Sequence, residues 1–138
     1  MTAKEYLSQV YKLDHKIYLM KLEVEEYRRL ASSIPGQDFT RERVQCTRNL
    51  EAPFVKWIYK AIDKEDEIKK KMEELLRIKT EVLSVIDKIE NDNYRVVLKL
   101  RYIDSLSWSE ISEKIYASDK TVRRWHNQAL ELVEVPIN

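Results

Sequence analysis

The sequence predicts an all-α protein: a long antiparallel helical hairpin followed by a compact three-helix domain. The 138 residues include one Gly and three Pro, and 36% of them are charged, a composition typical of long helices. Apolar residues recur at near-heptad spacing in two long stretches. The apolar content of 43% is also high enough for a folded chain.

The first long helix is predicted from Tyr6 onward. Its pattern ends at SSIPGQDF, where Ser32 and Ser33 favour local side-chain hydrogen bonds and Pro35-Gly36 interrupts the helix. The following residues show no sustained period, so a connector is predicted over about 32–53. The apolar seam of the helix alternates steps of four and three residues: Tyr6, Val10, Leu13, Ile17, Met20, Val24, Tyr27 and Ala31.

A second seam follows Pro53, and the two stripes are expected to pack against each other. Glu65 and Lys79 occupy two of its positions, and its apolar members are Phe54, Ile58, Ala61, Ile68, Met72, Leu75, Val82, Ile86 and Ile89. Apolar residues outside both seams would be covered by a second copy or by the C-terminal domain: Leu19, Leu22, Leu76, Leu83 and Val85. A homodimer is therefore expected.

A domain boundary is predicted at Glu90–Asn93, because Asn and Asp favour turns and N-caps. The domains are then residues 1–93 and 94–138. The second begins with a helix through YRVVLKLRYI. Ser107 caps a short helix, with Glu110 completing a capping box, and Ser118 caps the last helix.

The last two helices fit a helix-turn-helix, whose second helix enters the DNA major groove. Ile111 and Ile115 form the inner face of the first helix, and Ser112 lies where the helices cross. The second helix is predicted to bury Val122, Trp125, Ala129 and Leu132.

The segment SDKTVRRWHNQAL is basic, although the whole chain has a net charge of only +1. Arg and Lys pair with guanine edges or phosphates, and Asn and Gln bond to adenine. We predict DNA contacts by Ser118, Lys120, Thr121, Arg123, Arg124, Asn127 and Gln128, with His126 adding to the basic cluster. Ser107, Trp108 and Ser109 are predicted to contact the DNA backbone. The alternative for the cations is an ordinary solvated helix face.

The run YRVVLKLRYIDSLSWSEISEKIYASDKTVRRWHNQALELV resembles region 4 of bacterial sigma factors in its LRY, W-x-E-I, Ser cap, T-V and late A-L. With the hairpin and the RVQCT segment, nearly the whole chain resembles the RinA/ArpU-type late transcription regulators of phages and prophages. This resemblance implies a DNA-binding activator of late phage genes that acts through RNA polymerase. Lys120, Arg123 and Arg124 match the DNA-facing positions of that family.

Two features depart from this pattern. Tyr116 occupies the turn position where Gly is commonest, so this turn is expected to be strained or differently built. The chain also has no segment resembling the sigma region that melts the promoter, so a complete sigma factor is not expected.

Enzymatic chemistry is not expected. His15 and His126 are far apart in sequence, and neither has neighbours at metal-ligand spacing. There is no Gly-rich phosphate loop or nucleophile motif, and Cys46 is interpreted as incidental. No metal, cofactor or small-molecule substrate is predicted. Without a signal peptide or an apolar run of roughly 20 residues, a cytoplasmic location is expected. The resemblance to phage regulators implies that the cell is a bacterial host.

The main alternative function is a protein-interaction module that binds RNA polymerase or another regulator without specific DNA binding. The near-neutral net charge favours this alternative. In the connector, RERVQCTR is either an additional phosphate-contacting arm or an ordinary loop.

Overall fold

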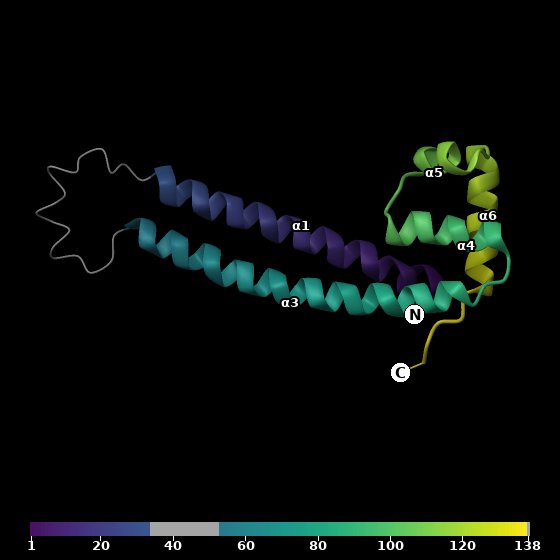
Figure 1. The fold of residues 1–138 in the computed structure, drawn as a ribbon, viewed down its shortest axis with the longest axis horizontal. Helices are drawn as coiled ribbons and strands as arrows, with labels where there is room; N and C mark the ends of the chain where they lie inside the picture. Colours follow the sequence, from purple (N-terminus) through teal and green to yellow (C-terminus); the bar gives the residue numbers. More distant parts are fainter. Residues whose placement is uncertain (34–52, 138) are drawn as a thin grey trace, which may run out of the picture. The chain divides into compact units, whose positions relative to one another are not determined.

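The computed structural model describes residues 1–33 and 53–137, and all regular structure within them is helical (Figure 1). The predicted all-α class is confirmed. The helices are α1 (Ala3–Ser33), α3 (Pro53–Asp87), α4 (Asp92–Leu98), the π-helical segment η1 (Lys99–Ile103), α5 (Trp108–Ile115) and α6 (Asp119–Leu132). None of these described helices has both the length and the apolar character needed to cross a bilayer. Most of the predicted connector, including Cys46, lies outside the described residues.

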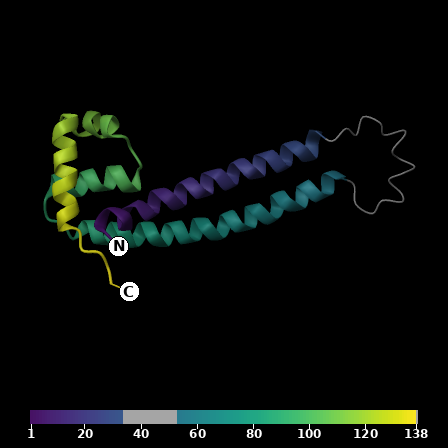
Figure 2. The ribbon, with the colours of Figure 1, turned by 180° about the vertical axis from the view of Figure 1, so that it is seen from behind.

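The chain forms two compact units, the hairpin unit (Lys16–Met72) and the composite unit (Met1–His15 with Glu73–Asn138). In each unit a segment of α1 lies beside a segment of α3 that runs in the opposite direction (Figures 1 and 2). In the hairpin unit, Lys64 Nζ lies 3.1 Å from Glu23 Oε2, and Arg28 pairs with Glu65. In the composite unit, the Tyr6 hydroxyl donates a hydrogen bond of 2.8 Å to Glu81 Oε1.

The seam of α1 is largely confirmed, with Tyr6, Val10, Ile17 and Met20 buried. Leu7 is also completely buried, although the seam did not include it. A coiled-coil seam is a narrow stripe, whereas a helix in a globular unit buries a wider one. Leu7 lies in the composite unit, which contains the C-terminal helices in addition to segments of α1 and α3.

On α3, most of the buried seam residues are spaced seven positions apart. The seam residues that lie between them are more exposed to solvent. Glu65 and Lys79 are half-buried, and Phe54 and Met72 are exposed, so their prediction as core residues is wrong. In a two-helix hairpin each helix packs against only one other helix. One of the two seam positions in each heptad therefore lies at the edge of the helix–helix contact and stays more exposed. The buried seam residues are Ala61, Ile68, Leu75, Val82 and Ile86 on α3, and Ile89 just after it.

The apolar residues outside the seams differ in exposure. Leu19, Leu22 and Leu76 are exposed, as expected for residues that the hairpin does not cover. Leu83 is half-buried and Val85 is buried, which agrees with the expectation that other parts of the protein cover them. Both of these residues belong to the composite unit, which encloses the C-terminal end of α3.

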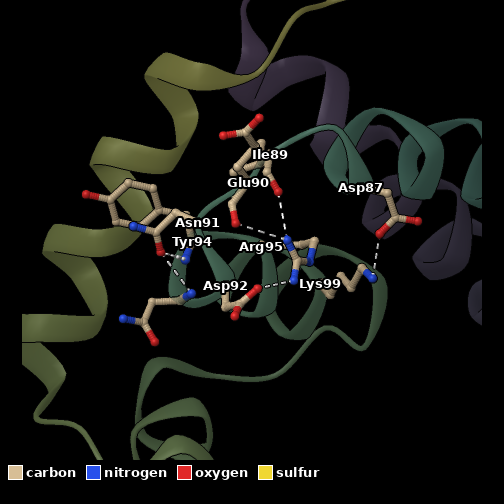
Figure 3. A network of polar contacts seen from close by, with 9 residues as sticks. Asp87, Ile89, Glu90, Asn91, Asp92, Tyr94, Arg95 and Lys99 are labelled. Atoms are coloured by element: carbon tan, nitrogen blue, oxygen red, sulfur yellow. Dashed lines mark hydrogen bonds and ion pairs between the residues drawn. The ribbon is translucent and has the colours of Figure 1, made fainter.

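A hydrogen-bonded turn joins α3 to α4 at the predicted Glu90–Asn93 boundary (Figure 3). Asn91 caps α4, and its side chain accepts hydrogen bonds from the backbone N–H groups of Asn93 and Tyr94. Arg95 pairs with Asp92 and donates to the Ile89 carbonyl at 2.8 Å. A second ion pair joins Lys99 to Asp87, with Nζ and Oδ1 2.7 Å apart. These contacts connect the end of α3 directly to the next two helical segments.

The helix predicted over YRVVLKLRYI has two parts. It begins as α4 and continues as the wider turns of η1, where the Asp104 N–H bonds to the Lys99 carbonyl at 3.1 Å. π-turns of this kind often occur at functional sites. Here the segment contains Arg101 and the buried Tyr102, which both contribute to the region described below.

Candidate nucleic-acid interface

Helices α5 and α6 form the predicted helix-turn-helix (Figure 1). Ser107 caps α5 in a capping box with Glu110, and Ser118 caps α6 by accepting the Thr121 N–H at 3.2 Å; both caps were predicted. Between the helices, Tyr116 has φ 56° and ψ 45°, the left-handed conformation expected at this turn position. Ser112 supports the turn through a hydrogen bond from its hydroxyl to the Ala117 carbonyl.

A small apolar core holds the two helices in place. Its buried residues come from four helical segments: Val97, Leu100, Ile111 and Val122. Partly buried side chains pack around them: Leu106, Trp108, Ile115, Ala117 and Trp125. α6 also buries Ala129. One side of α6 is thus used for folding, which leaves the opposite side free to contact a partner.

The opposite side of α6 carries what we call the candidate DNA-binding face: Lys120, Arg123, Arg124, Asn127 and Gln128. All five side chains are exposed. No carboxylate in residues 1–33 or 53–137 forms an ion pair with Lys120, Arg123 or Arg124. These cations therefore remain available to an external anion.

Two contacts mark the edges of the candidate DNA-binding face. On one edge, the Arg123 guanidinium carbon lies 5.8 Å from the centre of the Trp108 ring. On the other, the Tyr94 hydroxyl donates a hydrogen bond of 2.8 Å to Gln128 Oε1. These contacts restrain two long side chains before any ligand binds, which lowers the entropic cost of binding.

The other residues predicted to contact DNA have structural partners. The Ser118 hydroxyl is used in the cap of α6 and also donates to the Thr121 hydroxyl at 2.9 Å. Thr121 is half-buried. Among the predicted backbone contacts, Ser107 belongs to the capping box, Trp108 is half-buried and Ser109 is exposed. Their contact with DNA stays a prediction.

His126 does not belong to the basic cluster, contrary to the sequence interpretation. It is only 5% exposed, and its Nε2 lies 2.6 Å from the Tyr102 hydroxyl. Its ring also packs edge-on against Trp108, with the ring centres 4.8 Å apart. Burial lowers the pKa of His126 to about 4, helped by the positive charges of Arg101 and Lys4 and opposed by a hydrogen bond with Asn127. The imidazole is therefore neutral near pH 7.

The inner stripe of α6 differs from the prediction at two positions. His126 replaces Leu132 in the buried set, and Leu132 is 52% exposed. Leu132 is the last residue of α6, so it extends past the small core. Trp125 is half-buried against that core, as expected for a core residue.

Arg101 is a residue that the sequence interpretation missed. Its guanidinium carbon lies 4.2 Å from the Trp108 ring centre, and its Nη1 donates to the Leu106 carbonyl at 3.0 Å. Trp108 thus lies near two arginines, Arg101 and Arg123. The LRY motif contained Arg101, but only the fold brings it to Trp108.

In the part of the chain that the structure describes, no cluster of three or more potential metal ligands occurs. The side chains of the candidate DNA-binding face are cations and amides. These groups can bind phosphates and base edges without a cofactor.

Comparison with known proteins places the chain in a family. No curated protein and no solved structure matches the chain significantly. One family matches residues 40–134, more than half of the chain, including α3 and the whole helix-turn-helix. The chain therefore belongs to the family described as "Protein of unknown function (DUF1492)".

Proposed function

We propose that this protein is a sequence-specific transcriptional regulator that binds double-stranded DNA through α6. The observation that carries the proposal is the candidate DNA-binding face, with three exposed cations and two amides on the outer side of a helix-turn-helix. Arg and Lys neutralise phosphates and read guanine, while Asn and Gln read adenine. The resemblance to late transcription regulators extends the proposal to activation of late phage genes together with RNA polymerase.

Fluorescence anisotropy with a random-sequence duplex, titrated with salt, tests DNA binding. The affinity should fall steeply as salt rises, with a log–log slope of about −0.9 for each phosphate contact. Arg123→Ala plus Arg124→Ala should abolish binding and leave the helical content unchanged, because both side chains are exposed. Unchanged affinity of this double variant would refute the assignment.

The matched control is Lys69→Ala plus Lys70→Ala, which removes two exposed cations from α3 and produces the same net charge. This control should bind DNA like the parent protein. Equal losses in both double variants would show a general charge effect instead of a specific face. Selection of bound duplexes from a random library would then test sequence specificity.

A homodimer is part of the same proposal, since helix-turn-helix proteins commonly pair two half-sites. Leu19 and Leu22 are 45% and 42% exposed on α1 and provide an apolar surface for a second copy. Light scattering of the whole chain should give twice the monomer mass. Leu19→Lys plus Leu22→Lys should halve that mass, and a monomeric parent protein would rule the dimer out.

A protein-interaction module is the second candidate, and one observation favours it. Tyr116, in the turn before α6, is 95% exposed and holds a left-handed backbone that few non-Gly residues adopt. An exposed aromatic residue of this kind is a common anchor in protein interfaces. Polymerase capture that depends on Tyr116, in a protein that binds no DNA at low salt, would favour this function.

A further inference from the structure

A pocket of about 450 Å³ in the composite unit is not explained by the candidate DNA-binding face alone. We call it the α1–α5 pocket, because α1 contributes Lys4, Ser8 and Tyr11 while the N-terminal end of α5 contributes Ser107 and Trp108. Arg101 from η1 and the buried His126 from α6 complete the part of the lining used here. Segments from the two ends of the chain thus meet around one cavity.

The α1–α5 pocket carries a net positive charge. Lys4 and Arg101 are its two cations, and Glu110 is its one acid. The Glu110 carboxylate already accepts a hydrogen bond of 3.2 Å from the Ser107 N–H in the capping box. His126 adds no charge near pH 7, because burial lowers its pKa and the positive charges of Arg101 and Lys4 lower it further. Lys4 and Arg101 therefore both contribute positive charge to the pocket.

Arg101 is held in place before any ligand arrives. The Trp108 ring lies 4.2 Å from its guanidinium carbon, and the Leu106 carbonyl accepts one of its five N–H groups. Within the described residues, no carboxylate neutralises Arg101. A restrained guanidinium with donors to spare is well suited to bind phosphate oxygens.

Hydroxyl groups add neutral donors around the two cations. Ser8 and Ser105 line the pocket, and Tyr11 is 54% exposed at its edge. The lining thus combines two cations with several hydroxyl groups, and its one carboxylate is already hydrogen-bonded in the capping box. This combination favours a phosphate over a neutral or cationic ligand.

The pocket also adjoins the candidate DNA-binding face. Trp108 lines the pocket, and the Arg123 guanidinium carbon lies 5.8 Å from the centre of its ring. A duplex that contacts Arg123 would therefore bring its backbone close to the pocket.

We infer that the α1–α5 pocket binds a phosphate group through Lys4, Arg101 and its serine hydroxyls. Resting on the proposed function, the inference assigns this phosphate to the backbone of the duplex that α6 binds. The first turns of α1 then form part of the DNA interface, although they lie far from the helix-turn-helix in sequence. A phosphate from a free nucleotide has the same chemistry, and the experiment below separates the two sources.

The test compares Lys4→Gln with Lys88→Gln in the whole chain, by anisotropy with a random-sequence duplex at several salt concentrations. Both side chains are exposed and both belong to the composite unit, but only Lys4 lines the pocket. Lys4→Gln should reduce the salt slope by about 0.9, so that the affinity ratio between about 50 and about 200 mM salt falls about three-fold. Lys88→Gln should leave the slope unchanged.

A second arm titrates the protein alone with inorganic phosphate and with adenosine monophosphate at constant ionic strength, followed by NMR. Shifts of pocket residues that saturate with both ligands and disappear in Lys4→Gln would support the pocket with a free phosphate as its source. This result would hold even if the parent protein bound no duplex, so it is independent of the proposed function.

If Arg123→Ala plus Arg124→Ala abolishes duplex binding, while Lys4→Gln matches Lys88→Gln in the salt titration and free phosphate causes no saturable shifts at the pocket, the proposed function stands and the pocket inference fails. If the parent protein binds neither duplex nor free phosphate, both fail. Equal slope changes for Lys4→Gln and Lys88→Gln would also overturn the inference, because they would indicate general charge attraction.

Discussion

The neutral, buried His126 should make the protein less stable in mild acid. Its folded-state pKa of about 4 lies below the ordinary value of 6.5, so the unfolded chain binds a proton more readily. The stabilising contribution is therefore complete above about pH 6.5 and is lost as the pH falls towards 4. The full pKa difference corresponds to about 3 kcal/mol, of which roughly 2 kcal/mol should be lost between about pH 7 and about pH 5.

The assay is urea unfolding at a series of pH values, followed by far-UV circular dichroism and by tryptophan fluorescence. Coincident transitions would show that the two-state treatment holds. His126→Phe keeps a ring beside Tyr102 and Trp108 but cannot titrate, and it should remove most of the pH dependence in this range. His15→Gln is the control, because it removes an exposed histidine and leaves His126 in place.

Two results would refute this reasoning. One is a parent protein whose free energy of unfolding is the same at about pH 7 and about pH 5. The other is a His126→Phe variant that loses stability in acid as steeply as the parent, which would assign the effect to carboxylates elsewhere. An NMR titration showing that His126 is protonated near its ordinary pKa would contradict the structural cause directly.

Three further substitutions test the local structure by urea unfolding. Tyr116→Gly should stabilise the protein by about 1 kcal/mol, because Gly adopts the left-handed turn conformation without strain; a loss of stability would mean that the exposed ring has a packing role. Tyr6→Phe should destabilise it by about 1 kcal/mol through loss of the hydrogen bond to Glu81, and no change would show that solvent replaces the bond. Ser118→Ala should cost about 1 kcal/mol by removing the cap of α6, whereas Ser118→Asp should restore it.

The features that the sequence predicted well depend on neighbouring residues. The caps at Ser107 and Ser118, and the capping box with Glu110, require only a few residues in a fixed order. The left-handed turn at Tyr116 likewise follows from the spacing between the two helices. The overall class follows from the heptad patterns, because such long periods rarely arise outside helices.

The position of His126 could have been predicted but was not. It lies four residues after Val122 and three before Ala129, which places it on the buried side of α6. Its residue type suggested a cation, and a cation is favoured at the surface. The spacing was the stronger signal, since a neutral imidazole can be buried when Tyr102 provides a hydrogen bond.

The α1–α5 pocket could not be predicted from local patterns. Lys4 and Ser8 lie in the first turns of α1, and Arg101 and Trp108 lie far along the chain. Their proximity depends on the packing of the composite unit, which no periodicity in the sequence encodes. The exposure of Met72 is a similar case, because it depends on how many partners α3 has at that point.

The composition of the composite unit has a consequence for synthesis on the ribosome. Met1–His15 emerges well before the rest of its unit, whose remaining residues begin at Glu73. Lys16–Met72 is continuous and can collapse early, whereas the composite unit must wait and then form contacts between distant parts of the chain, which slows folding. During that interval Leu7 and Val10, both fully buried in the finished protein, are open to chaperones and to aggregation with neighbouring nascent chains.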